Sequence, residues 1–197
     1  MSDFAEPEVP PIAEVPPLLW ARRQSLPVQG GLLIAGVMAL VLSSRVAIPV
    51  GPVPVTLQTL AVSLVGALYG RRLGGACVVA WLLAGAAGLP VFAGASAGVQ
   101  KFLGPTAGYL FAFPLAAMAV GWLVERGWDR GRFLRLLALM VLSNAICLLF
   151  GAAWLGSAIG LEKALIRGVA PFLVGAALKS ILGALVLALL SARSVRA

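Results

Sequence analysis

The stretch PFLVGAALKSILGALVLALL, residues 171–190, decides how this chain is organised. It is apolar and long enough to cross the hydrocarbon core of a bilayer, which takes about 20 helical residues. Lys179 lies within it, and an ionisable residue at membrane depth is costly and by default marks a functional site. Counted from Pro171 at about 1.5 Å per residue, Lys179 lies about 12 Å into a core about 30 Å thick.

No acidic residue is placed to neutralise Lys179 within the membrane. The seven acids are Asp3, Glu6, Glu8, Glu14, Glu125, Asp129 and Glu162, all of them in the N-terminal tail or in connections between apolar segments. Gly175 and Gly183 lie one turn to either side of Lys179, so a neighbouring helix can approach closely. We expect the ammonium to face the interior of a helix bundle and to bind an anion. The alternative is a lysine whose stem reaches back to the membrane interface.

Composition places the whole chain among polytopic membrane proteins. Of its 197 residues, 61% are hydrophobic, 11% are charged and none is histidine, which is not the composition of a soluble domain. Without histidine, and with only Cys77 and Cys147 as thiols, the sequence offers neither a common metal cluster nor a paired nucleophile. We therefore predict no catalytic residue, no metal site and no cofactor. The net charge of +8 is not arranged as a basic stripe among aromatics, so nucleic acid is not expected as a partner.

Apolar windows predict an all-α membrane protein with six transmembrane helices. The windows cover residues 29–47, 55–70, 74–89, 106–124, 133–154 and 169–191. The second and third are short for a span, which favours broken or re-entrant ends that line a cavity. Residues 1–28 are predicted to be a disordered, acidic, proline-rich cytoplasmic tail, 29–192 the membrane domain, and 193–197 a short basic cytoplasmic tail.

The distribution of basic residues sets the expected orientation. With six spans, one side carries Arg22, Arg23, Arg71, Arg72, Arg126, Arg130, Arg132, Arg135, Arg193 and Arg196. The other side carries only Arg45, Lys101, Lys163 and Arg167. Because basic residues are enriched in cytoplasmic connections, both termini are predicted to be cytoplasmic.

Two external connections are long, apolar and rich in glycine and proline. AIPVGPVPVT, residues 47–56, is expected to be extended because proline also restricts its predecessor. We do not expect a continuous helix in residues 88–109, GLPVFAGASAGVQKFLGPTAGY, because of their glycines and prolines. We expect the two loops to form a lid over a pocket that opens outward. The alternative is a pair of idle connections at the membrane surface.

Polar residues near the outer ends of the spans could build a ligand site. They are Thr56, Gln58 and Thr59, then Thr106 and Tyr109, and finally Lys179. A few convergent polar groups in an apolar wall are typical of a site for a small ligand with a polar head, although threonine hydroxyls often bond their own helix backbone. Asn144 lies deep in the fifth window, where an interhelical hydrogen bond is a more common role than ligand contact.

A ridge of small residues runs along the first window. Gly31, Ala35, Ala39 and Ser43 recur every four residues and share one helix face. Such a ridge permits close packing against another helix. The spacing alone leaves open whether that helix belongs to this chain or to a second protein.

Four motifs resemble the BioY family, the biotin-specific substrate-binding S components of energy-coupling factor (ECF) transporters. They are VPVTLQTLAV (53–62), GLPVFAG (88–94), GPTAGYLFAF (104–113) and PFLVGAALK (171–179), and the resemblance covers about residues 29–190. It implies a six-helix fold in the bacterial cytoplasmic membrane with biotin bound near the outer face under external loops. Through the second motif it adds Phe92 to the candidate binding residues.

The resemblance also implies partners. These are a transmembrane coupling subunit and a pair of cytoplasmic ATPases, with Ala35 and Ala39 matching the family's alanine patch for the coupling subunit. The chain has no GxxxxGK[ST] phosphate loop of its own, so the energy for uptake comes from elsewhere. A self-sufficient, homo-oligomeric secondary transporter of biotin or another vitamin carboxylate stays open as the alternative. A membrane enzyme is disfavoured because acids and histidines are missing at membrane depth.

One position departs from the family pattern. The last motif usually carries an aspartate three residues before the lysine, and this chain has Ala176 there. Lys179 keeps the ammonium that the resemblance assigns to the biotin carboxylate but lacks the neighbouring acid. Either the ligand alone supplies the counter-charge, or the lysine is partly neutral when the site is empty, since burial disfavours the charged form.

Overall fold

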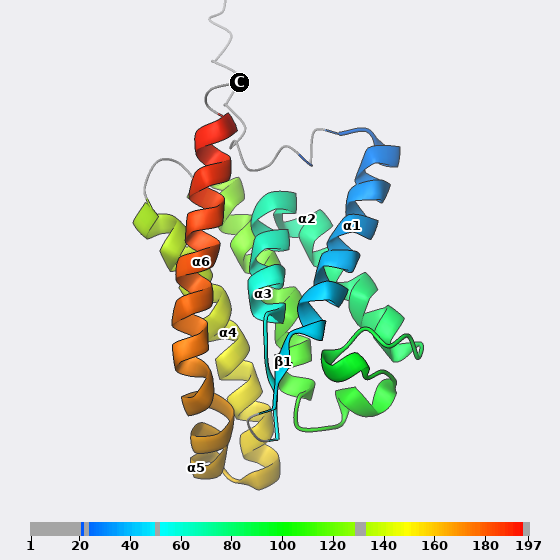
Figure 1. Cartoon of the computed structure of the whole chain (residues 1–197), viewed down its shortest axis with the longest axis vertical. Coiled ribbons are helices and arrows are strands. Elements are labelled where there is room, and N and C mark those ends of the chain that lie inside the picture. Colours follow the sequence, from blue (N-terminus) through cyan, green and yellow to red (C-terminus); the bar gives the residue numbers. More distant parts are fainter. Residues whose placement is uncertain (1–20, 22–23, 50–51, 129–132, 195–197) are drawn as a thin grey trace, which may run out of the picture.

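Long helices joined by short connections build the chain (Figure 1). The computed structural model describes residues 21, 24–49, 52–128 and 133–194. Its elements are α1 (Leu26–Arg45), β1 (Ala47–Ile48), β2 (Val55–Thr56), α2 (Gln58–Ala86), η2 (Ala93–Ala95), η3 (Val99–Phe102), α3 (Ala107–Glu125), α4 (Phe133–Ile159), α5 (Leu161–Ala164), η4 (Leu165–Val169) and α6 (Ala170–Ser194). Most of the predicted tails, 1–28 and 193–197, lies outside the described residues.

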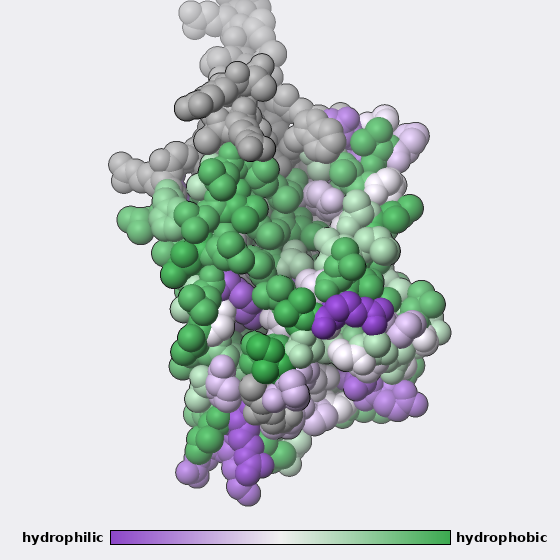
Figure 2. All heavy atoms as spheres, in the orientation of Figure 1, coloured by the Kyte–Doolittle hydropathy of each residue, from purple (hydrophilic) through white to green (hydrophobic). Residues whose placement is uncertain are grey.

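Five stretches of helix in the described part are long and apolar enough to cross a membrane. They are Leu26–Arg45, Gln58–Ala86, Ala107–Glu125, Phe133–Ile159 and Leu161–Ser191. The all-helical character predicted from composition is therefore observed, apart from one pair of two-residue strands. Figure 2 shows a largely hydrophobic surface over α6 and its neighbours, with hydrophilic side chains gathered toward the lower end of the view. That distribution suits contact with lipid.

The second and third predicted spans, 55–70 and 74–89, lie largely within α2, which reverses direction at Gly70. This glycine has φ 76° and ψ 178°, a conformation that side chains with a Cβ rarely adopt. A Cβ on Gly74 would lie only 3.0 Å from the Cα of Gly66, whereas residues eight apart in a straight helix are about 12 Å apart. The two halves of α2 therefore fold back against each other, and these glycines permit the close approach.

The remaining helices pack around this reversed pair. α3 lies along α2, and α4 packs on α3 and α6. One core cluster includes Val120, Leu139, Met140 and Leu187, and a second is built around Trp81 and its neighbours near the loops. Two hydrogen bonds join helices inside this core, from the Ser63 hydroxyl to Ser143 at 2.7 Å and from the Asn144 amide to Ser180 at 3.2 Å.

The two long connections lie together at one end of the molecule. The first contains the antiparallel pair β1 and β2, with Ala47 opposite Thr56 and Ile48 opposite Val55, so its described part is extended as predicted. The second holds the short turns η2 and η3 and no continuous helix. The start of α1 and the end of α6 lie at the opposite end (Figure 1).

Candidate functional site

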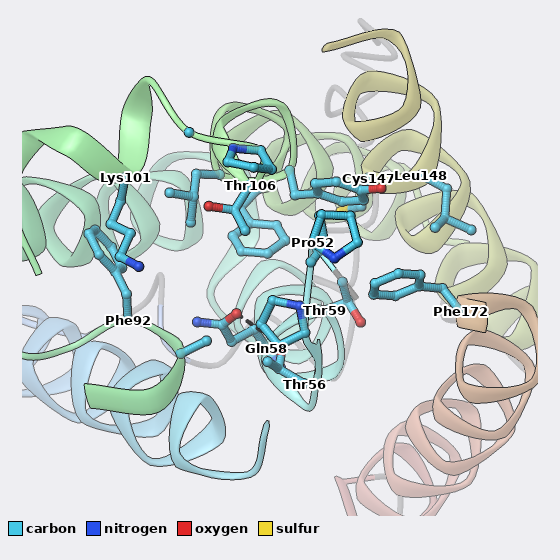
Figure 3. A pocket seen from close by; sticks show the side chains of 18 of the residues that line it. Pro52, Thr56, Gln58, Thr59, Phe92, Lys101, Thr106, Cys147, Leu148 and Phe172 are labelled. Atoms are coloured by element: carbon cyan, nitrogen blue, oxygen red, sulfur yellow. Dashed lines mark hydrogen bonds between the residues drawn. The ribbon is translucent and has the colours of Figure 1, made fainter. Parts of the chain in front are cut away.

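A cavity of about 300 Å³ lies at the loop end of the bundle (Figure 3). Its walls come from both long connections and from α2, α3, α4 and α6. The lining residues are Pro52, Val53, Pro54, Thr56, Gln58, Thr59, Phe92, Ala93, Ser96, Gln100, Lys101, Gly104, Pro105, Thr106, Tyr109, Leu110, Phe113, Asn144, Cys147, Leu148, Phe172, Ala176 and Lys179. Its volume is at the small end of the range for ligand sites, about 300–1,000 Å³.

The structure brings together every binding residue predicted from the sequence. Thr56, Gln58, Phe92, Thr106, Tyr109, Asn144 and Lys179 all line this one cavity. They come from segments up to 123 residues apart in sequence, as in the contact between Lys179 and Thr56. Both long loops and four helices must therefore fold correctly before the site exists.

Lys179 is buried, with 8% of its surface exposed. Its Nζ donates to the carbonyl oxygen of Thr56 at 3.1 Å and to the hydroxyl of Thr59 at 2.6 Å. The side chain thus points into the bundle, and the alternative of a lysine reaching the interface is not what the structure contains. Both partners are neutral, so they orient the ammonium without cancelling its charge.

The described lining of the cavity carries positive charge and no carboxylate. Lys101 and Lys179 are its basic residues, and Ala176 lies in the wall where the resemblance implies an acid. A site with two basic side chains and apolar walls favours a small anionic ligand. The anion forms charge-assisted hydrogen bonds with the lysine ammonium groups, in place of the hydrogen bonds that water would make.

Thr56 and Gln58 form one hydrogen-bonded unit where β2 gives way to α2. The Thr56 hydroxyl donates to Gln58 Oε1 at 2.9 Å and accepts from the Gln58 backbone N–H at 3.3 Å. This unit fixes the start of α2 at the floor of the cavity. In Figure 3 the Gln58 amide nitrogen points to the side of the cavity where Phe92 and Lys101 lie.

Two other predicted residues, Tyr109 and Asn144, donate hydrogen bonds to groups of the protein itself. The Tyr109 hydroxyl donates to the carbonyl oxygen of Gly168, which lies in η4, a π-helical turn. Asn144 donates to Met140 O at 3.0 Å and to the Ser180 hydroxyl at 3.2 Å. Asn144 therefore joins α4 to α6, and the Tyr109 hydroxyl joins α3 to η4, the turn that precedes α6.

The second loop is fastened at its base. The carbonyl oxygen of Val91 accepts from the Trp81 indole at 3.1 Å and from the Ser44 hydroxyl at 2.8 Å, and Arg45 donates to Pro90 O at 2.9 Å. Phe92 follows directly, is 2% exposed, and packs edge-on against Trp81 with ring centroids 5.1 Å apart. These contacts make Phe92 a fixed part of the cavity wall.

Several lining residues were not predicted from the sequence. Lys101 was counted only as an external basic residue, and Phe172, Cys147 and Gln100 were not proposed for the site. Their positions depend on how η3 folds over the bundle and on which face of α4 and α6 turns inward. Neither leaves a local signal in an apolar sequence with weak periodicity.

The small-residue ridge lies on the outside of α1. Ala35 and Ala39 are exposed, whereas Gly36, Leu40 and Ser44 form the buried face. A Cβ on Gly36 would lie 2.9 Å from both Cys77 Sγ and a ring carbon of Tyr69, so this glycine sets the close contact with α2. In the described chain the ridge of Gly31, Ala35, Ala39 and Ser43 is therefore not the internal packing surface.

Comparisons with known proteins agree with the motifs. A family model described as the BioY family matches residues 22–196. A probable biotin transporter BioY of Pyrococcus horikoshii is 40% identical over 131 residues, which cover 66% of this chain and 76% of that protein. Biotin transporter BioY2 of Lactococcus lactis subsp. cremoris is 34% identical over 155 residues, covering 77% and 83% respectively.

A solved structure has the same fold. It is the S component for biotin from an ECF-type ABC transporter, and it superposes with a TM-score of 0.76 at 27% sequence identity. The match covers 82% of this chain and 89% of that chain.

Proposed function

The chain belongs to the BioY family, and from that premise we propose that it is the membrane subunit that binds biotin for uptake, acting as the S component of an ECF-type ABC transporter. The observation that carries the proposal is the cavity at the loop end, which collects residues from all four motifs around the buried Lys179, with no carboxylate in its described lining. A transport role also fits a chain without paired acid–base or nucleophilic residues.

Within the cavity, the biotin carboxylate binds at Lys179. The ammonium has three N–H donors and uses two of them on Thr56 and Thr59, so one remains for an anion. The rings of Phe92, Tyr109, Phe113 and Phe172 supply apolar wall for the bicyclic part of the ligand. The missing acid at Ala176 means that the ligand alone provides the counter-charge.

In the membrane, each half of α2 crosses separately, so the chain makes six crossings. The reversal at Gly70 and the contact between Gly66 and Gly74 support this arrangement. The start of α1 and the end of α6 then lie on the cytoplasmic side of the bacterial cytoplasmic membrane, as the distribution of arginines favours. The cavity, at the other end, opens outward.

The coupling subunit docks on the outer face of α1 at Ala35 and Ala39, and it links the chain to a pair of cytoplasmic ATPases. Exposed small residues at a four-residue spacing suit close approach of a partner helix in the membrane. The self-sufficient homo-oligomer is the less favoured alternative, because the structural likeness is to a component of an ABC transporter.

Binding and uptake of tritiated biotin test this function. The purified full chain is expected to bind biotin without any partner, and cells are expected to accumulate it only when the coupling subunit and active ATPases are co-expressed. A purified, folded chain that does not bind biotin contradicts the ligand. Uptake at the same rate without the ATPases contradicts the S-component role and favours the homo-oligomer.

A further inference from the structure

Gln58 holds a buried donor that the protein leaves unused. The residue is 5% exposed, and its Nε2 is the buried side-chain nitrogen or oxygen that lacks a hydrogen-bond partner in the described part of the chain. Leaving such a group unpaired costs free energy, and buried polar groups in native proteins nearly always have partners. An orphaned donor in the wall of a ligand cavity therefore points to a partner that arrives with the ligand.

The orientation of this donor is set by Thr56. Because the Thr56 hydroxyl accepts from the Gln58 backbone N–H, its own hydrogen is free to bond Gln58 Oε1 at 2.9 Å. The oxygen of the amide is thereby occupied on the side of β2, and the NH₂ group is the edge that faces the cavity (Figure 3).

The chemistry of the donor limits what it recognises. An amide N–H is neutral, so it matches an uncharged carbonyl oxygen, whereas a carboxylate gains more from an ammonium such as that of Lys179. Biotin carries two strong acceptor groups, its carboxylate and the carbonyl oxygen of its ureido ring. With the carboxylate at Lys179, the ureido oxygen is the acceptor that remains.

We propose that Gln58 Nε2 donates a hydrogen bond to the ureido carbonyl oxygen of biotin and that Thr56 is the positioning residue that fixes the amide for this contact. The assignment rests on the proposed biotin-binding function. It makes Gln58 a specificity residue, because a ligand without that acceptor leaves the buried donor unpaired and is disfavoured for this reason.

A ligand-by-variant comparison on the purified full chain tests the proposal. Competition against tritiated biotin is measured for biotin, for 2-thiobiotin, in which sulfur replaces the ureido oxygen, and for biotinamide, which lacks the carboxylate. The wild-type chain is expected to prefer biotin over 2-thiobiotin by about tenfold, since sulfur is a much poorer acceptor. In Gln58→Leu this preference should fall to within about twofold, while the preference for biotin over biotinamide stays.

Four further variants make the result specific. Gln29→Leu makes the same side-chain change on α1, away from the cavity, and should keep the wild-type preference. Thr56→Val removes the hydroxyl and should reduce the preference for biotin over 2-thiobiotin, whereas Thr56→Ser keeps the hydroxyl and should retain it. Gln58→Met replaces Gln58→Leu if the latter does not fold, as judged by its melting temperature.

Failure of this proposal is distinct from failure of the function. If the wild-type chain binds biotin and Gln58→Leu keeps the full preference over 2-thiobiotin, the preference is steric and Gln58 does not read the ureido oxygen. If Gln58→Leu instead loses its preference over biotinamide, Gln58 binds the carboxylate end and the assignment is overturned. If the wild-type chain does not bind biotin, the proposed function itself fails.

Discussion

The ammonium nitrogen of Lys179 on α6 lies 2.6 Å from the hydroxyl oxygen of Thr59 on α2. The same nitrogen reaches the carbonyl oxygen of Thr56 at 3.1 Å, so one cation joins the end of the β-strand pair and the start of α2 to the last helix. These neutral partners hold the side chain in place but leave its charge uncompensated. We expect a ligand carboxylate to complete both the hydrogen bonding and the charge balance at this point.

Replacing Lys179 with alanine should weaken biotin binding by roughly ten- to a hundredfold, the equivalent of a charge-assisted hydrogen bond of about 1.5–3 kcal/mol. Equilibrium binding of tritiated biotin to the purified chain measures this. Lys163→Ala, which removes an exposed cation on α5, is the matched control and should leave the affinity unchanged. A folded Lys179→Ala protein with wild-type affinity removes the lysine from the site.

Replacing Tyr109 with phenylalanine should affect stability more than binding. The hydroxyl is bonded to Gly168 O, while the ring stacks on Phe172 with centroids 5.9 Å apart. Losing the buried hydrogen bond should cost about 1 kcal/mol and lower the melting temperature of the ligand-free protein. The affinity for biotin should stay within about threefold, and a larger loss at unchanged stability contradicts this structural role.

The sequence predicted the chemistry of the site better than its geometry. Lys179, Thr56 and Gln58 were identifiable because polar residues are conspicuous in apolar segments. Gln100 and Lys101 lie in η3, whose place at the cavity depends on its packing against α2 and α3 and is not marked in the local sequence.

The helices were foreseen to a similar extent. The apolar windows predicted most of the helix, and two of them correspond to the two halves of α2, which Gly70 reverses beside the exposed Arg71 and Arg72. The outward direction of Ala35 and Ala39 was left open by the sequence, since a stripe of small residues looks the same whether its partner is internal or external. The buried Gly36 on the other face of α1 resolves this only in three dimensions.

Bulky residues on the ridge should separate ligand binding from partner binding. In the double variant Ala35→Trp and Ala39→Trp, the isolated chain should bind biotin with its normal affinity, because both positions are exposed. Co-purification with a coupling subunit should be lost. Gly36→Trp is the contrasting variant and should destabilise the chain itself, since a Cβ there already crowds Tyr69 and Cys77. If the double variant Ala35→Trp and Ala39→Trp does not bind biotin, the ridge supports the site.

Single cysteines in the two loops should report closure over the ligand. Pro52 and Gln100 both line the cavity and are exposed, so a cysteine at either, in a background with Cys77 and Cys147 changed to alanine, should react with an impermeant maleimide from outside. Biotin should slow both reactions, because a ligand favours the covered state through its extra contacts there.

Val99→Cys supplies the control for this experiment. Val99 neighbours Gln100, is 59% exposed and is absent from the cavity lining, so its labelling rate should not depend on biotin. Labelling from the cytoplasmic side alone contradicts the orientation. Labelling of all three cysteines at rates indifferent to biotin contradicts the lid.

The carbonyl oxygen of Val91 accepts two hydrogen bonds and thereby connects α1 to the wall of the cavity. Ser44, on the buried face of α1, and Trp81 both hold this oxygen, and Phe92 follows it directly into the cavity. If a coupling subunit docks on the outer face of α1, we expect a shift of this helix to reach the proposed ligand site through this oxygen. Thermodynamic linkage then requires reciprocity: a coupling subunit that changes the affinity for the vitamin by some factor has its own affinity changed by the vitamin by the same factor.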